Sequence, residues 1–134
     1  KNKLTIINDS KSTSFSSSIG ILKMNSNIYW LIGGVPKKGD TFNLPNEYQK
    51  KIKAFIYGKN TFFFYKQLEG KIKVENFKNL KGALRRIFKI LDKEKSNHKT
   101  ILFSPCAASF DSFRNFEDRG LYFNKLVKNY LNER

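Results

Sequence analysis

The sequence has a single cysteine, Cys106, and a single histidine, His98, among its 134 residues. One cysteine excludes an internal disulfide, as is usual for a reducing compartment. The same scarcity leaves nothing from which to build a metal cage of the His/Cys type, and we expect no metal site in this chain. No apolar run approaches the roughly 18 residues that a membrane-spanning helix needs, and no leading signal segment is visible. These absences predict a cytoplasmic protein without a membrane partner.

Acidic residues are also scarce: the chain has 11 of them against 26 basic residues, which gives a formal net charge of +15. Such a balance suggests a nucleic-acid partner. However, only five of the basic residues are arginines, and arginine is the residue that base and phosphate recognition favours. The lysines are scattered along the chain. Solvated surface charge is therefore the preferred interpretation over a nucleic-acid footprint, while a free-standing basic nucleotide- or nucleic-acid-binding module stays open as the alternative.

The length predicts one domain, and a hydrophobic content of 40% is typical of a globular protein. Hydrophobic patterning predicts strands over 4–8, 28–34, 54–58, 72–77 and 100–104. Helices are predicted over 14–24, 44–53, 60–70, 79–94 and about 111–131. The segment 60–70 suits a strand equally well by composition, but Asn60 and Thr61 can cap a helix there and Gly70 can end it. This alternation predicts the α/β class, with a mostly parallel twisted sheet of about five or six strands and helices on both faces.

Three segments rich in polar and small residues each follow a predicted strand: 8–14, 33–40 and 104–113. Parallel sheets bind their ligands outside the carboxyl ends of the strands. We therefore expect these three segments, which are far apart in the sequence, to converge on one edge of the sheet.

Taken singly, the first two segments have plain structural interpretations. Asp9 or Ser10 could cap the following helix and leave Lys11 solvated. The functional interpretation is that Lys11 and Thr13 hold an anion at the amino terminus of that helix. The paired glycines of the second segment favour an ordinary turn, because a Walker loop needs a different spacing.

The third segment raises the question of a nucleophile. Cys106 would need a nearby base, but His98 precedes the strand that leads to this loop, at the opposite edge of a parallel sheet. Ser109 has neither a triad nor a Gly-x-Ser-x-Gly elbow, and Asp111 is most simply the cap of the last helix. We predict no catalytic residue here. Small side chains with hydroxyl and backbone N–H donors suit recognition of a carboxylate.

Together the segments DSKSTS (9–14), GGVPK (33–37) and SPCAASFDSFRNFEDRG (104–120) resemble the motifs of the carboxyl-terminal domain of the Mur ligases, most closely the D-glutamate-adding members. The match runs in the same order along nearly the whole chain. There are departures: Ser14 stands where the family has Asn, and the cysteine has moved one place to Cys106. A catalytic thiol could not tolerate that shift, whereas a small filler could.

The resemblance implies a Rossmann-like domain over 1–134, from which the amino-terminal UDP-binding and central ATPase domains are absent. It implies an ATP- and Mg²⁺-dependent reaction of peptidoglycan synthesis in the bacterial cytoplasm. An acyl phosphate forms on UDP-N-acetylmuramoyl-L-alanine, and the amine of D-glutamate attacks it. The missing domains would supply the ATP and nucleotide-sugar sites, so the isolated domain would bind no cofactor of its own and be inactive.

The resemblance also assigns residues by position. Its D-glutamate set is Thr13 and Lys37 for one carboxylate, and Ser109 with the backbone of Phe110 and Phe116 for the other. Asp9 and Lys11 would face the nucleotide and its phosphates. A dicarboxylate needs two separate sets of donors, and the second and third segments would provide them.

Overall fold

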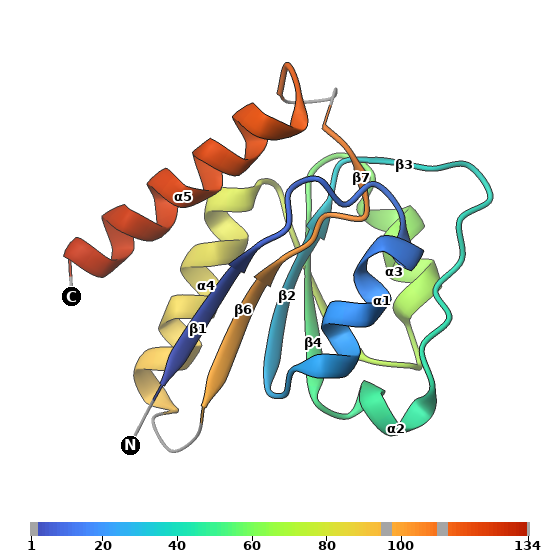
Figure 1. Ribbon diagram of the computed structural model, residues 1–134, viewed down its shortest axis with the longest axis horizontal. Helices are drawn as coiled ribbons and strands as arrows, with labels where there is room; N and C mark the ends of the chain where they lie inside the picture. The colour runs from blue at the N-terminus through green and yellow to red at the C-terminus, as the bar shows by residue number, and fades with distance from the viewer. Residues whose placement is uncertain (1–2, 95–97, 110–112, 134) are drawn as a thin grey trace.

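The central element of the computed structural model, which describes residues 3–94, 98–109 and 113–133, is a five-stranded sheet in the order β1-β6-β2-β4-β5. Its strands are β1 (Leu4–Asn8), β2 (Ile28–Gly33), β4 (Ile52–Tyr57), β5 (Lys73–Phe77) and β6 (Lys99–Phe103). Every neighbouring pair in this sheet is parallel. The prediction of an α/β fold with a mostly parallel sheet is therefore confirmed (Figure 1).

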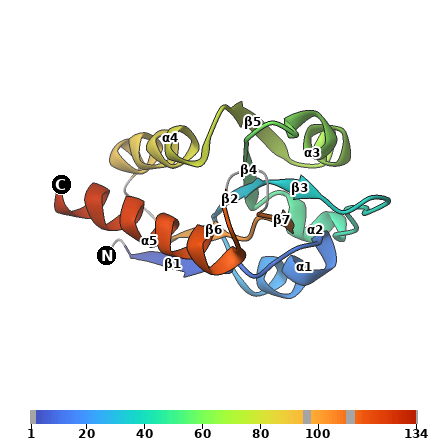
Figure 2. The same cartoon turned by 90° about the horizontal axis from the view of Figure 1, so that it is seen from above.

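Helices cover both faces of the sheet. They are α1 (Phe15–Met24), α2 (Asn46–Gln49), α3 (Thr61–Leu68), α4 (Leu80–Lys93) and α5 (Phe116–Asn132). Alternate residues of β2 divide between two cores, with Trp30 packing among side chains of α1 and α3, and Leu31 among those of α4 and α5. Figure 2, seen from above, shows α4 and α5 toward the left of the view and α1 and α3 toward the right. Among the described residues, no helix is long and apolar enough to span a bilayer.

Two predicted helices have different bounds in the structure. The segment 44–53 contains only the four-residue helix α2, and the chain enters β4 at Ile52, which lies opposite Ile28 of β2. Pairing with a buried strand overrides the local helical pattern there. The last helix begins at Phe116, not near 111, because the side chain of Asn115 accepts a hydrogen bond from the backbone N–H of Asp118 and caps it. The predicted cap Asp111 lies outside the described residues.

The helix predicted over 60–70 is confirmed as α3, with Phe64 and Leu68 buried and Gly70 in a left-handed conformation just beyond its end. Asn60 occupies the N-cap position but does not cap with its side chain, which donates to the carbonyl of Gly34 at 2.9 Å. The expectation that Asp9 or Ser10 caps the first helix was wrong, because α1 starts at Phe15 with Ser14 at the N-cap.

Candidate functional site

The three polar loops meet at the carboxyl ends of the strands, as predicted. We name them the first loop (8–14), the second loop (33–40) and the third loop (104–113, of which the structure describes 104–109 and 113). The amide of Asp9 donates to the carbonyl of Phe103 at 2.7 Å, and the amide of Gly33 donates to the carbonyl of Pro105 at 3.2 Å. Backbone hydrogen bonds from the ends of β1 and β2 therefore hold the end of β6 and the start of the third loop.

A second, two-stranded sheet joins the second and third loops. Its strands β3 (Val35–Pro36) and β7 (Ala107–Ala108) are antiparallel, with Val35 opposite Ala108 and Pro36 opposite Ala107. Lys37 follows β3 directly and Ser109 follows β7 directly, so these two predicted ligands flank opposite ends of one short ladder. A rise of about 3.3 Å per residue puts their backbones on the order of 10 Å apart.

The predicted D-glutamate residues differ in exposure. Lys37 and Thr13 are exposed at the rim, whereas Ser109 is only 3% exposed. Phe116 is 42% exposed, and its carbonyl already accepts from the hydroxyl of Ser10 at 2.7 Å. Its N–H is the first of α5, and the first N–H groups of a helix have no intrahelical acceptor, so that group is the backbone donor Phe116 can offer. Phe110 lies outside the described residues.

Of the two residues predicted to face the nucleotide, Lys11 is exposed and Asp9 is buried. One carboxylate oxygen of Asp9 accepts from the hydroxyl of Ser104 at 2.8 Å, and the Ser104 hydroxyl also contacts that of Ser18. The carbonyl of Ser104 accepts from the indole N–H of Trp30 at 2.8 Å. Asp9 therefore anchors the first loop on the third loop.

Cys106 is a buried structural residue. Its side chain is fully buried, its Sγ lies 3.0 Å from the hydroxyl of Ser18, and its amide donates to the hydroxyl of Ser12 at 3.2 Å. Burial raises the pKa of the thiol to about 12, so it carries no thiolate near neutrality. His98 bonds Thr5 at the other end of β1, at 2.7 Å. The prediction that Cys106 is a small buried residue is confirmed.

Sequence reasoning missed Arg119, which is 1% exposed and lies on the first turns of α5. Its Nε donates to the hydroxyl of Ser10 at 3.1 Å, and one terminal nitrogen donates to the carbonyl of Ala107 at 2.9 Å. A helical signal could have found it, because Arg119 precedes the buried Phe123 and Leu126 by four and seven residues and so shares their inward face.

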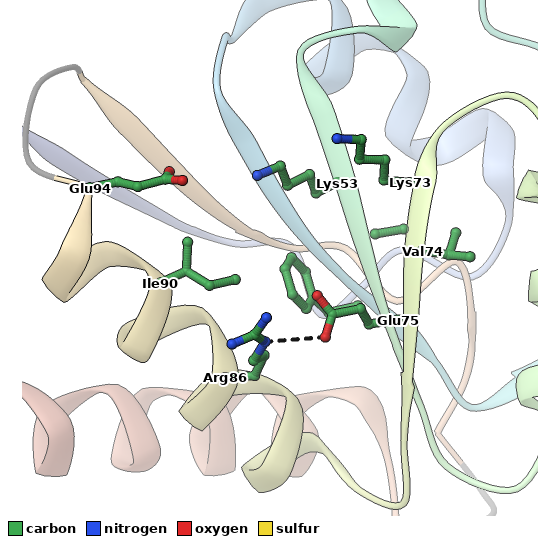
Figure 3. Close-up of a pocket in the computed structure, with 9 residues that line it drawn as sticks. Lys53, Lys73, Val74, Glu75, Arg86, Ile90 and Glu94 are labelled. Carbon is green, nitrogen blue, oxygen red and sulfur yellow. Dashed lines mark hydrogen bonds and ion pairs between the residues drawn. The ribbon is translucent and has the colours of Figure 1, made fainter.

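A groove of about 450 Å³ lies away from these loops, against β4, β5 and α4 (Figure 3). Lys53 and Lys73 stand opposite each other in its wall, near the amino ends of their strands. Arg86 pairs with Glu75 at 3.2 Å inside it. Because it is near the opposite edge of the sheet, this groove is separate from the candidate site. The described residues contain no cluster of three or more His, Cys, Asp or Glu side chains that could hold a metal ion.

No family model matches the chain. Curated proteins do match it, under the name UDP-N-acetylmuramoylalanine–D-glutamate ligase. The protein of Rickettsia felis is 35% identical over 132 residues, which is 98% of this chain and 29% of that protein. The protein of Wolbachia sp. subsp. Brugia malayi is 39% identical over 91% of this chain and 24% of its own length, and that of Hydrogenobaculum sp. is 39% identical over 96% and 31%.

The chain thus spans less than a third of the length of these relatives, and almost all of it is matched. The chain belongs to the Mur ligase family, in which it corresponds to the carboxyl-terminal domain of the D-glutamate ligases.

Proposed function

We propose that this chain is the D-glutamate-binding domain of an ATP-dependent ligase that adds D-glutamate to UDP-N-acetylmuramoyl-L-alanine in bacterial cytoplasmic peptidoglycan synthesis. The domain would span 1–134 of a longer polypeptide that also carries a UDP-binding and an ATPase domain. The name and length of the relatives support this proposal. The observation that carries it is the ladder of β3 and β7, which sets Lys37 and Ser109 at its two ends.

Two donor sets suit the two carboxylates of D-glutamate. The ammonium of Lys37 and the hydroxyl of Thr13 are exposed and would hold one carboxylate. The hydroxyl of Ser109 and the N–H of Phe116, with the backbone of Phe110, would hold the other. Charge-assisted hydrogen bonds of this kind are about twice as strong as neutral ones. The spacing of the two sets would then select a diacid over a monoacid.

The reaction divides into two steps. ATP transfers its γ-phosphoryl group to the alanine carboxylate, which gives ADP and an acyl phosphate. The amine nitrogen of D-glutamate then attacks the carbonyl carbon and forms the amide bond. The C–O bond to the phosphate breaks, phosphate leaves with that electron pair, and the nitrogen loses a proton. The contribution of this chain is to hold the amine at attack distance, which replaces a bimolecular encounter.

The nucleotide side of the proposal rests on Lys11, whose exposed ammonium suits a phosphate group. Asp9 would act beside it through the oxygen that Ser104 does not engage. Because the described residues hold no acidic or His/Cys cluster of metal-binding size, we derive no step through Mg²⁺ in this domain.

The test uses the complete ligase that contains this chain. Lys37→Ala and Ser109→Ala should each raise the KM for D-glutamate at least tenfold, measured as phosphate release. Lys38→Ala is the matched control, since Lys38 is the exposed neighbour of Lys37 and should leave the KM unchanged. A wild-type KM in both site variants would refute the residue assignment. The competing nucleic-acid module would instead show a gel shift that weakens steeply with salt.

A further inference from the structure

The guanidinium group of Arg119 lies where the three loops come together. It donates to the hydroxyl and carbonyl of Ser10 in the first loop, and to the carbonyl of Ala107 in the third loop. In the second loop, a Cβ placed on Gly34 would lie 3.4 Å from a terminal nitrogen of Arg119. One side chain of α5 therefore touches segments that are about a hundred residues apart, at the edge where the proposed substrate site lies.

A cation is an unusual choice at this position. Arg119 is the fourth residue of α5, near the positive end of the helix dipole, where negative side chains are favoured. Burial of a charge is also costly unless hydrogen bonds compensate it. The nitrogens of Arg119 donate to two carbonyls and one hydroxyl of the first and third loops. These acceptors are arranged to match a planar fork, which lysine cannot reproduce.

The hydrogen bonds connect Arg119 to both parts of one donor set. The hydroxyl of Ser10 accepts from Arg119 and donates to the carbonyl of Phe116, which fixes the first turn of α5 against the first loop. Ala107 belongs to β7 and lies two residues before Ser109. Phe116 and Ser109 are the residues proposed to hold the second carboxylate, so Arg119 fixes the backbone on either side of that set.

We propose that Arg119 is a positioning residue for the diacid, which sets the geometry of the Ser109 and Phe116 donors without contacting the substrate. This rests on the proposed function. Loss of the planar guanidinium group should loosen the Ser109 and Phe116 donors. The exposed side chains of Lys37 and Lys11 should stay in place. The KM for D-glutamate should then rise, and the KM for ATP should not.

The experiment is steady-state kinetics of the complete ligase carrying Arg119→Lys, which keeps the charge and removes the fork. We expect at least a tenfold rise in the KM for D-glutamate, with the KM for ATP within twofold of wild type. Arg114→Lys is the matched control, because the Arg114 side chain is 82% exposed and pairs with Asp118 at 3.1 Å just before the start of α5. It should change neither constant.

A second comparison separates positioning from loss of stability. Leu91→Ala removes a buried side chain of α4 far from the loops, and it should lower the melting temperature without raising the KM for D-glutamate. Ser10→Ala removes the hydroxyl bridge to Phe116 and should raise that KM even if Arg119→Lys does not fold. The proposal is overturned if Ser10→Ala and any folded Arg119→Lys keep the wild-type KM, or if Leu91→Ala raises it equally. A wild-type ligase without D-glutamate-dependent phosphate release would refute the proposed function itself.

Discussion

Ser104 donates its hydroxyl hydrogen to a buried carboxylate oxygen of Asp9 at 2.8 Å, across 95 residues of sequence. Asp9 directly follows the strand β1 and Ser104 directly follows the neighbouring strand β6, so the bond ties the start of the first loop to the start of the third loop. The same hydroxyl contacts Ser18 of α1. The candidate site therefore rests on a buried hydrogen-bond network of Asp9, Ser104 and Ser18. The contribution of this network to the free energy of unfolding can be measured.

Ser104→Ala should destabilise the chain by about 1.5–3 kcal/mol, the usual effect of losing a hydrogen bond to a charged group. The buried Asp9 carboxylate would lose a donor that water cannot readily replace. Urea unfolding followed by circular dichroism gives the free energy of unfolding. Ser16→Ala, at an exposed position of α1, should change it by less than about 0.5 kcal/mol. An equal effect of the two substitutions would contradict this account.

Gly34→Ala should separate the second loop from the third. Gly34 has a φ of +123°, and a Cβ there would lie 2.5 Å from the carbonyl oxygen of Ala108. We expect a loss of at least about 1–3 kcal/mol of stability from strain at this position and a raised KM for D-glutamate in the complete ligase.

Gly39→Ala is the control for backbone strain alone, since Gly39 has a φ of +80° with open space around it. It should leave the KM unchanged. If Gly34→Ala bound D-glutamate as well as Gly39→Ala does, the ladder of β3 and β7 would not be needed for the site.

The thiol of Cys106 should be unreactive in the folded chain. Burial raises its pKa to about 12, so iodoacetamide at pH 8 should modify it only after unfolding in urea, as followed by mass spectrometry. Cys106→Ala should retain ligase activity, because we assign the thiol a packing role. Rapid alkylation of the native chain, with parallel loss of activity, would support a nucleophile instead.

Tyr29 should make stability fall at high pH. Its burial, with Glu94 accepting from its hydroxyl at 2.9 Å, raises its pKa from 10.0 to about 12. The unfolded chain releases this proton near pH 10 and the folded chain holds it. The stability linked to the neutral hydroxyl is thus full below pH 10 and lost as the pH rises to about 12.

The fall in the free energy of unfolding between pH 9 and 11.5, measured by urea unfolding, is the slope to compare. In Tyr29→Phe the part of this slope that is due to Tyr29 should vanish, and in Glu94→Gln it should shrink. The difference from wild type isolates this group from the lysines that titrate in the same range. An unchanged slope in Tyr29→Phe would show that another group causes the loss.

The parallel sheet and the convergence of the loops could be predicted from the sequence because both follow from local patterns and from one rule about strand direction. The pairing of Val35 with Ala108 could not, since two residues give no periodicity. The burial of Arg119 was missed because a charged residue in a helix is normally expected at the surface, whereas here its contacts with Ser10 and Ala107 accommodate it in the interior. The short helix α2 was overpredicted because strand pairing begins at Ile52.

A crystal structure of the complete ligase with D-glutamate tests the central claim most directly. We predict one carboxylate within hydrogen-bonding distance of Lys37 Nζ and the other within that distance of Ser109 Oγ, with the amine turned toward the ATPase domain. D-glutamate bound away from the edge where β3 and β7 meet, with neither residue in contact, would contradict it.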